Sequence, residues 1–477
     1  MNVERKAKVI LSFDDIDTLR GGCTTHFATK IIKIFLSRGW KLEDFPRLVR
    51  LNPDIPWKTR GNASIAIVLS NENYNIYLDD IKNLIHTELV SYISSNYPVA
   101  GHSQPTFIVA DFDYILLKSE FFKDIYRKAI KSTLNVNVIR EKTAKIIEDG
   151  IGKRIFIESV LGDRGIVGSL ASIGYLFEEG DYTFELLAYK KEDEKAKENG
   201  NLNAIYSYFL ENEDISTFGN IDTYSKKTII TPHGPDPVLF GLRGDNPLVL
   251  VTVFKELQTL YENLIDDWMI FKSNQGTDIH HQNLDHLVEN PLYSQIEVLI
   301  FKLKKKEVLP SGHYIFKMVT SGYDSLLASD MELACYKEAL KMREVLEKIE
   351  GECLLLLNGN IRPNLETSTI TLNLEKSYVI LLKTNLLTVK IICPRCLNLL
   401  ESMGREKGLR CRKCGYRVQV RDNLKISLNK DLVTTVLHEP PMYQRHLTKP
   451  LKRFGREIIT KSIESEEIAL KIINSYS

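Results

Sequence analysis

Residues 8–25 read KVILSFDDIDTLRGGCTT and organise the first part of the chain. The apolar run up to Phe13 predicts a buried strand. After the glycines, apolar side chains recur at helical spacing, at Phe27, Ile31 and Phe35. Three carboxylates therefore stand where a strand is expected to end, followed by a glycine pair and the first turn of a helix.

This acidic turn has the composition of a metal–phosphate site. Carboxylate oxygens are ligands that Mg²⁺ prefers, glycine lets backbone N–H groups approach an anion, and a helix N-terminus attracts phosphate. The alternative is that the residues only shape a turn and cap the helix. Three carboxylates within four positions repel one another without a cation, which favours the metal–phosphate site. The expected functional residues are Asp14, Asp15, Asp17, Thr24 and Thr25, with Asp14 and Asp15 as the magnesium ligands and Gly21 and Gly22 against the phosphates.

A basic loop follows at residues 48–62, LVRLNPDIPWKTRGN. Its prolines predict an irregular but ordered backbone, and it carries Arg50, Lys58 and Arg60. Three cations in such a loop can neutralise a transferred phosphate or an RNA backbone. For this loop alone, an ordinary solvated surface is the alternative. Next to the acidic turn, we expect it to bind phosphate.

The composition is that of a globular protein with several domains. The 477 residues exceed what one core supports, and 43% hydrophobic and 26% charged residues are ordinary values. Because no apolar run could span a bilayer and the N-terminus lacks a signal-peptide core, we expect a cytoplasmic protein without a membrane partner. With a net charge of +1, nucleic-acid binding would rest on local basic patches.

The middle of the chain predicts a second α/β unit. A run of small residues at 162–174 suits close helix packing, and a backbone that passes near a ligand is the alternative. A stretch rich in proline and glycine at 231–244 is expected to be an exposed binding loop between strands near 227–231 and 248–253. The side chains that this loop would present are His233, Asp236 and Arg243.

Residues from about 262 to 385 are expected to form short strands and one helix at 336–349. Such a pattern is typical of a five-stranded OB barrel, a fold that often binds single-stranded nucleic acid. The predicted strands are 268–271, 296–303, 313–319, 352–357, 368–374 and 378–382.

The strongest chemical signal is a pair of C-x-x-C motifs. Cys393 and Cys396 form the first, and Cys411 and Cys414 form the second. Four thiolates arranged in this way predict one tetrahedral Zn²⁺ in a zinc ribbon, and two motifs at matched spacing disfavour a redox-active dithiol. A four-cysteine site is closed, so its zinc would be structural. Nearby Lys and Arg residues suit phosphate contacts.

A basic segment follows at residues 443–456, where five Lys and Arg residues alternate with His, Tyr and Phe. This mixture is typical of an RNA-binding patch. A solvated helix end is the alternative for any one of these residues.

These stretches together resemble the archaeal tRNA-isoleucine 2-agmatinylcytidine synthetases. The acidic turn with Cys-Thr-Thr and the loop Arg-Leu-Asn-Pro…Lys-Thr-Arg-Gly-Asn match the kinase-type module of that family. The similarity continues in order to about residue 453, through residues 271–280 and 445–451. One departure is Ile16, where the family usually has threonine, so no hydroxyl can act at this position.

The resemblance implies an ATP-dependent ligase that joins agmatine to the wobble cytidine of tRNA(Ile) with a CAU anticodon. The product, 2-agmatinylcytidine (agmatidine), lets the tRNA decode AUA. ATP is consumed to AMP, its γ-phosphoryl group goes to the cytosine carbonyl oxygen, and the agmatine amine displaces the phosphate. Phosphorylation turns a poor leaving group into a good one. Thr24 matches a threonine that the family autophosphorylates.

The resemblance also implies ligands and residues for each module. ATP, Mg²⁺ and Zn²⁺ are the expected cofactors, and the guanidinium of agmatine calls for a carboxylate partner. The expected agmatine-binding residues are Asp236, with Asp222 and Asp163 as alternatives, and Arg243. The expected tRNA-binding residues are Asn274, Gln275, Thr277, His280, Arg445, His446 and Lys449.

The predicted architecture is a multidomain α/β and α+β protein. Two other functions remain open. A non-catalytic RNA-binding translation accessory protein would explain the C-terminal modules but would give the acidic turn no role. A small-molecule phosphotransferase would explain the N-terminal half but would give the C-terminal half no role. The expected domains are a kinase-like α/β sandwich at 1–132, a ferredoxin-like agmatine-binding domain at 133–260, an OB-fold β-barrel at 261–386, a zinc ribbon at 387–422 and a basic extension at 423–477.

Overall fold

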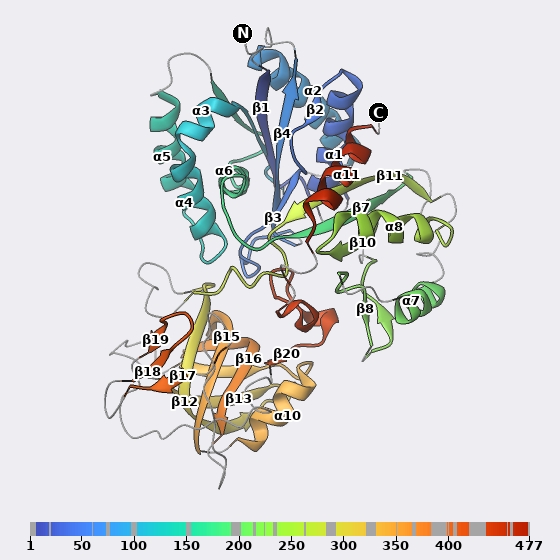
Figure 1. The fold of residues 1–477 in the computed structure, drawn as a ribbon. Helices are drawn as coiled ribbons and strands as arrows, with labels where there is room; N and C mark the ends of the chain where they lie inside the picture. The colour runs from blue at the N-terminus through green and yellow to red at the C-terminus, as the bar shows by residue number, and fades with distance from the viewer. Residues whose placement is uncertain are drawn as a thin grey trace. The chain divides into compact units, whose positions relative to one another are not determined.

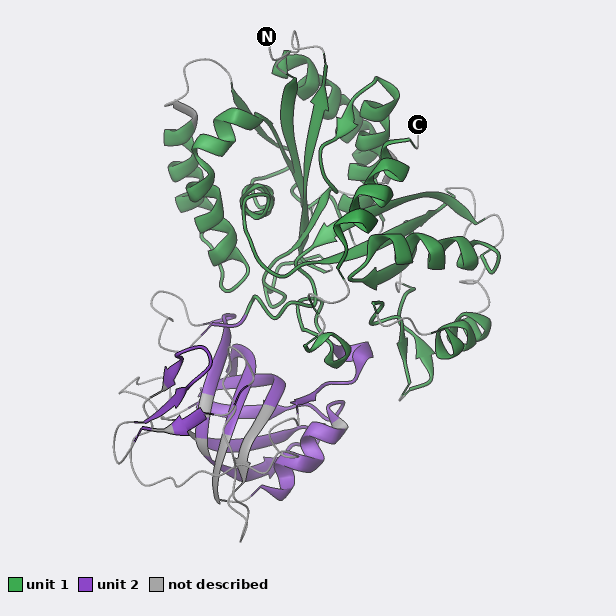
Figure 2. Cartoon of the chain, viewed as in Figure 1, with its two compact units in different colours: residues 1–280, 445–477 green, residues 281–444 purple. Residues whose placement is uncertain are grey.

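The computed structural model has a mixed α/β fold with two compact units (Figure 2). Unit 1 contains residues 1–280 and 445–477, and unit 2 contains residues 281–444. The structure describes residues 6–18, 21–59, 61–72, 77–96, 103–148, 154–191, 202–212, 216–223, 225–231, 236–261, 264–282, 292–320, 331–349, 351–364, 369–382, 398, 400–403, 408–418, 436–455, 457 and 461–475.

Unit 1 is built on a nine-stranded sheet with the order β10-β7-β11-β3-β4-β1-β5-β6, and β2 pairs with β4 (Figure 1). Its pairs are antiparallel except β11 with β3. The strands are β1 (Ala7–Asp14), β2 (Lys41–Leu42), β3 (Arg47–Arg50), β4 (Ala63–Asn71), β5 (Thr106–Asp111), β6 (Ile155–Ser159), β7 (Thr183–Lys190), β10 (Val238–Gly244) and β11 (Ile265–Ser273); β8 (Ile221–Asp222) and β9 (Lys227–Thr228) form a separate pair.

Helices cover both faces of this sheet. One hydrophobic core includes residues of α1, α2, α8 and α11, and another includes residues of α3 to α6. No helix in the described part of the chain is long and apolar enough to cross a membrane. The helices are α1 (Thr24–Ser37), α2 (Leu78–Asn96), α3 (Phe112–Leu117), α4 (Ser119–Ala129), α5 (Val136–Glu148), α6 (Ile166–Tyr175), α7 (Leu202–Glu211), α8 (Pro247–Gln258) and α11 (Ile463–Asn474).

The central strand β1 alternates between the two cores, as a strand buried on both faces must. Leu11 and Phe13 belong to the core on the α1 side, and Ile10 belongs to the core on the α6 side. Ser12 also faces α6, where its Oγ donates to the Ser169 carbonyl at 2.8 Å. Small side chains at this contact let α6 lie close to the strand, which confirms close helix packing for the run of small residues.

Two predictions around residue 244 are wrong. Residues 248–253 are not a strand but lie in α8, because Asn246 accepts hydrogen bonds from the N–H groups of Leu248 (3.0 Å) and Val249 (3.3 Å) and Pro247 occupies the first turn. The supposed binding loop is also partly regular, since its second half forms the mostly buried strand β10. Residues 232–235 of that loop, including His233, lie outside the described residues.

Unit 2 contains a six-stranded sheet, a three-stranded sheet and a helix. In the larger sheet, β14 pairs antiparallel with β13 and parallel with β16. The strand predicted at 268–271 is not part of it, because β11 pairs with β7 and β3 in unit 1. The elements are β12 (Gln295–Val308), β13 (Tyr314–Thr320), β14 (Met331–Cys335), α10 (Leu340–Lys348), β15 (Gly351–Asn364), β16 (Thr369–Leu382), β17 (Leu400–Ser402), β18 (Leu409–Cys411), β19 (Arg417–Val418), β20 (Val436–His438) and the short helix η2 (Pro441–Tyr443).

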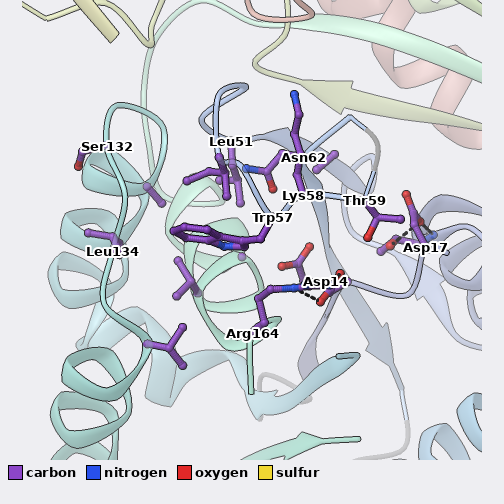
Figure 3. A pocket seen from close by; sticks show the side chains of 18 residues that line it. Asp14, Asp17, Leu51, Trp57, Lys58, Thr59, Asn62, Ser132, Leu134 and Arg164 are labelled. Carbon is purple, nitrogen blue, oxygen red and sulfur yellow. Dashed lines mark hydrogen bonds and ion pairs between the residues drawn. The ribbon is translucent and has the colours of Figure 1, made fainter. Parts of the chain in front are cut away.

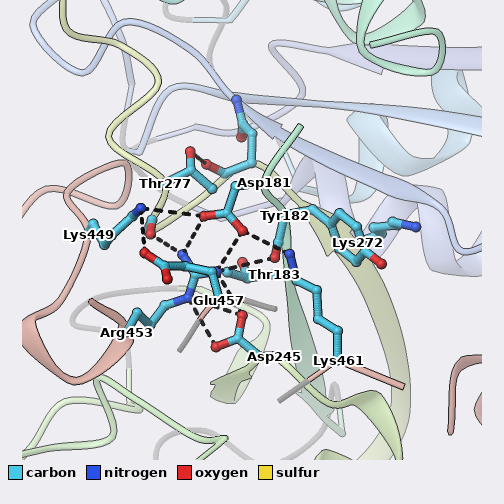
Figure 4. Close-up of polar contacts among 12 residues, drawn as sticks. Asp181, Tyr182, Thr183, Asp245, Lys272, Thr277, Lys449, Arg453, Glu457 and Lys461 are labelled. Atoms are coloured by element: carbon cyan, nitrogen blue, oxygen red, sulfur yellow. Dashed lines mark hydrogen bonds and ion pairs between the residues drawn. The ribbon is translucent and has the colours of Figure 1, made fainter. Parts of the chain in front are cut away.

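The C-terminal segment returns to unit 1 and is held there by buried ion pairs around Arg453 (Figure 4). This arginine, in the short helix η3 (Leu451–Arg453), is 1% exposed. Its guanidinium donates to Asp245 (2.7 Å) and Asp181 (2.9 Å) and to the Gly276 carbonyl. The segment after unit 2 is therefore an integral part of unit 1.

Candidate active site

The acidic turn begins where β1 ends at Asp14 and leads into α1. Asp15 adopts a left-handed backbone conformation, with φ of 58°, so the chain reverses sharply after the strand. Asp17 then accepts hydrogen bonds from the Thr24 N–H at 2.6 Å and the Thr24 hydroxyl at 3.0 Å. The Asp17 carboxylate therefore lies at the N-terminus of α1, where the helix dipole favours negative charge.

Arg164 supplies the counter-charge for Asp15. Its Nε and Nη2 atoms donate to the two carboxylate oxygens at 2.7 Å and 2.9 Å. The Gln104 N–H donates to the same carboxylate at 2.9 Å. Burial raises the pKa of Asp15, while Arg164 opposes that shift.

Asp14 lies deeper, against the glycine face of α6. It is 9% exposed, and a Cβ added at Gly168 would lie 2.1 Å from its Oδ2. Burial, followed by the charge of Asp15, raises the pKa of Asp14 well above its ordinary value. One arginine for three carboxylates leaves this end of the site with excess negative charge, which suits a divalent cation.

A pocket of about 750 Å³, including its open mouth, joins the acidic turn to the basic loop (Figure 3). All three aspartates, Thr24 and Arg164 line one end. Lys58 and Asn62 line it from the basic loop, and the remaining wall is mostly apolar. The structure thus brings together carboxylates, a hydroxyl at a helix N-terminus and two cations, a combination suited to phosphoryl transfer.

The other predicted phosphate-binding residues have different positions. Arg50 is not among the pocket-lining residues; its Nη2 pairs with Glu185 at 2.9 Å, and Glu185 also accepts from Arg243 Nε at 3.2 Å. Arg60 lies outside the described residues. The Gly21 N–H donates to the Thr18 hydroxyl at 3.1 Å, and Gly22 has a φ of 71° that suits glycine.

Thr25 is also directed away from the pocket. It is buried in the first turn of α1, and its hydroxyl lies 3.0 Å from Cys23 Sγ. Among the two threonines, Thr24 is the one that lines the pocket.

The predicted agmatine-binding carboxylates each have a partner within unit 1. Asp163 pairs with Arg140 at 2.7 Å on the surface. Asp222 is buried and accepts from the Ser225 hydroxyl at 2.9 Å, while Asp236 accepts from the Val238 N–H at 3.0 Å. None of the three lines the described pocket.

The segment after β11 holds the start of the basic loop in place through hydrogen bonds. Asn274 is fully buried; its Oδ1 accepts from the Arg50 N–H at 2.8 Å and its Nδ2 donates to the Arg50 carbonyl at 2.9 Å. Thr277 donates to the Asn274 carbonyl at 2.5 Å, and Gln275 is 1% exposed. His280 is the last residue of this part of unit 1. In this structure Asn274 and Gln275 are framework residues rather than an exposed RNA contact.

The predicted RNA-binding residues of the tail lie in the returning segment of unit 1. Arg445 pairs with Asp54 of the basic loop at 2.8 Å. His446 is exposed, and the charge of Arg50 lowers its pKa. Lys449 pairs with Glu457 at 2.9 Å. The tail therefore places the guanidinium of Arg445 beside the basic loop.

The described half of the cysteine cluster has the shape of a zinc knuckle. Cys411 ends β18, its carbonyl accepts from the Gly415 N–H at 3.0 Å, and Gly415 has a φ of 73°. Cys411 is buried and Cys414 is exposed. Cys393 and Cys396 lie outside the described residues.

Sequence reasoning did not assign a role to Arg164, Gly168, Glu185 or Trp57. Arg164 and Gly168 lie in the run of small residues at 162–174, and the one arginine in that run was the feature that could have indicated a functional site. Trp57 lies next to Lys58 in the basic loop, and an aromatic residue beside a cation was the signal there. Glu185, inside an apolar strand, had no local signal beyond its charge.

Known proteins are similar to this chain in both sequence and fold. Family models match residues 10–82 (TiaS TCKD domain), 163–280 (TiaS FLD domain) and 391–429 (TiaS C-terminal zinc ribbon domain). The chain is 33% identical to the tRNA-isoleucine 2-agmatinylcytidine synthetase TiaS of Staphylothermus marinus, covering 94% of both chains. It is 30% identical to the Ignisphaera aggregans protein of the same name, covering 94% and 93%. A crystal structure of TiaS in complex with its isoleucine tRNA and ATP superposes with a TM-score of 0.70 at 25% identity, covering 94% of this chain and 97% of that one.

Proposed function

The chain belongs to the family of tRNA-isoleucine 2-agmatinylcytidine synthetases, and we propose from this that it is an ATP-dependent ligase. It would join agmatine to the wobble cytidine of tRNA(Ile) with a CAU anticodon. The relatives are named for this activity. Crystal structures of relatives have been solved in complex with the isoleucine tRNA and ATP, and with the isoleucine tRNA, AMPCPP and agmatine. The observation that carries the proposal is one pocket lined by Asp14, Asp15, Asp17 and Thr24.

Mg²⁺ fits the acidic end of this pocket. Both oxygens of Asp15 already accept from Arg164, whereas Asp14 is buried beside two other carboxylates. A nucleoside triphosphate would add further negative charge, so a divalent cation is needed to offset the repulsion. We therefore assign the ion to Asp14 and Asp17 instead of the expected pair of Asp14 and Asp15; the ion would neutralise charge on the phosphates.

Thr24 is the residue that would accept a phosphoryl group. Its hydroxyl donates to Asp17, which can orient the oxygen and take its proton. Its N–H lies at the start of α1, where the helix dipole favours a phosphate. Lys58 and Arg164 would stabilise charge on the transferred group from the two sides of the pocket.

The remaining modules would bind the RNA and agmatine. We assign residues 163–280 to a ferredoxin-like domain, and strands β12 to β16 to an OB barrel, a reading supported by the pairing of β14 with both β13 and β16. Zn²⁺ would be held by Cys393, Cys396, Cys411 and Cys414. Asp163, Asp222 and Asp236 remain candidates for the agmatine guanidinium, and Arg445, His446 and Lys449 for tRNA phosphates.

Product analysis tests this function. The protein is incubated with ATP, agmatine and a CAU-anticodon tRNA(Ile) transcript, and the digested nucleosides are weighed by mass spectrometry. We expect one cytidine to gain an agmatine group only when ATP and agmatine are both present. Asp15→Asn should abolish ATP turnover and leave tRNA binding intact, whereas the surface variant Asp124→Asn should behave as wild type. ATP turnover without modified cytidine would contradict the proposed substrates.

A further inference from the structure

The pocket beside the acidic turn has a second, apolar end. Leu51, Ile55 and Trp57 line it from the basic loop, Leu134 lines it from the connection that follows α4, and Val136 lines it from the start of α5. In Figure 3 the Trp57 ring stands in the middle of the pocket, with Leu134 on one side and Asp14 on the other. The site therefore offers an apolar, aromatic surface and a phosphate-binding end within one cavity.

Trp57 is unusual among the tryptophans of this chain. It is 51% exposed, whereas Trp40 and Trp268 are each 7% exposed. Covering an indole face with an apolar or aromatic ligand is favourable. An exposed tryptophan inside a pocket thus indicates a ligand with a flat, apolar part.

The loop that carries Trp57 is held by its own hydrogen bonds. The Leu51 N–H donates to the Asn62 carbonyl at 3.0 Å, and the Asn52 N–H donates to the Ala129 carbonyl at 3.1 Å. The Asp54 N–H donates to Asn52 Oδ1 at 3.0 Å. Because the loop is ordered on both sides, it presents the indole ring at a fixed place and lowers the entropic cost of stacking.

We propose that Trp57 stacks on the adenine of ATP, between the apolar wall and the acidic turn. The inference rests on the proposed function, in which ATP is the phosphoryl donor. Trp57 and Lys58 are consecutive and both line the pocket, so an aromatic and a cationic group face one ligand that carries a base and phosphates.

The wobble cytidine is the other base that could stack here. However, its ring is the group that must receive the phosphoryl group, so it has to lie at the end formed by Asp14, Asp17 and Thr24. The apolar end is then left for a base that does not react. This reasoning favours adenine at Trp57.

Binding measurements with two ligands test the stacking. Isothermal titration calorimetry of the full-length protein uses Mg²⁺ with ATP, and Mg²⁺ with tripolyphosphate, which lacks the base. Trp57→Ala should weaken ATP binding by about 10- to 100-fold, from the loss of one stacked base, and leave the tripolyphosphate affinity unchanged. Trp57→Phe should retain most of the ATP affinity.

Fluorescence gives a signal that a purely structural role would not produce. Only one of the three tryptophans is exposed in the pocket, so ATP should quench the emission of the wild type and of Trp40→Phe, but not of Trp57→Phe. Equal losses of ATP and tripolyphosphate affinity in Trp57→Ala would overturn the stacking proposal. So would unchanged ATP affinity with weakened tRNA binding, which would assign Trp57 to the cytidine. A wild type that binds no ATP would overturn the proposed function as well.

Discussion

The guanidinium of Arg164 donates to both carboxylate oxygens of Asp15, although the two residues stand 149 positions apart. Asp15 belongs to the segment matched by the TCKD model, and Arg164 to the segment matched by the FLD model. The pocket is therefore assembled from both segments, and neither holds the acidic turn in place without the other.

Arg164→Lys should lower ATP turnover although it keeps the positive charge. A lysine cannot donate to both oxygens of Asp15, so the carboxylate would lose its fixed orientation. We expect a fall of about 10- to 100-fold in kcat/KM for ATP, as for other residues that orient an active-site ligand. Steady-state kinetics measure it, with Arg140→Lys, at the exposed pair with Asp163, as the matched control. Wild-type kinetics in Arg164→Lys would show that the ion pair has no role in turnover.

Two glycines on α6 should respond differently to alanine. A Cβ at Gly168 would lie 2.1 Å from a side-chain oxygen of Asp14, which can move aside at the expense of the site. A Cβ at Gly174 would lie 2.1 Å from the Phe122 carbonyl oxygen, which belongs to a packed backbone. Gly168→Ala should therefore reduce ATP turnover strongly with a small change in Tm, and Gly174→Ala should mainly lower Tm. Thermal unfolding and turnover measured on both variants distinguish these effects; the same change in both would contradict the assignment.

Glu185 should make stability depend on pH. Burial alone would raise its pKa, but the charges and hydrogen bonds of Arg50 and Arg243 outweigh burial and hold its pKa below the ordinary value. The stabilisation is therefore complete at pH values above the unfolded pKa of about 4.3 and is lost as the pH falls through the folded pKa.

Glu185→Gln removes that stabilisation and leaves two arginines without their buried partner. We expect a loss of about 3–5 kcal/mol in the free energy of unfolding at pH 7, and a smaller difference from wild type as the pH falls below about 4. Urea unfolding at several pH values measures it, with the exposed Glu120→Gln as a control. A difference that stays constant with pH would argue against ionised Glu185 as the source.

Cys414→Ser should remove zinc and weaken tRNA binding without weakening ATP binding. Cys414 belongs to unit 2, whereas every residue that lines the pocket belongs to unit 1. Zinc content, tRNA affinity and ATP affinity are measured on the same preparation. Lys413→Ala, one residue away, tests the charge of the turn while keeping all four thiolates. Equal losses of ATP and tRNA affinity in Cys414→Ser would mean that the metal is required for the whole fold.

Local patterns were sufficient for the acidic turn, because β1, the three carboxylates and α1 follow one another within residues 7–37. The apolar residues 248–253 were ambiguous, since a short apolar run fits a buried strand or a buried helix. The Asn246–Pro247 pair was the deciding helix signal. A similar limit affected β11: its strand character was clear from its residues, but its pairing with β7 depends on long-range contacts.

The candidate site was predictable only where its residues are neighbours in sequence. Asp14, Asp17, Thr24 and Lys58 were expected and line one pocket. Arg50 was expected there as well, but the buried carboxylate of Glu185, 135 positions away, binds its guanidinium instead. Such competition between charged partners depends on which strands become adjacent, and no local pattern reports it.

The return of the C-terminal segment to unit 1 has a consequence for how the protein is made. The Asn474 side chain pairs with both main-chain groups of Leu42, at 2.8 Å and 3.1 Å, and Arg453 is buried among carboxylates of the same unit. A ribosome delivers these residues only after all of unit 2. The nascent chain therefore lacks a complete pocket-bearing unit until residues 445–477 have been synthesised. Loss of residues 445–477 would therefore damage the pocket-bearing unit, and unit 2 can be removed only by an internal excision that joins residue 280 to residue 445.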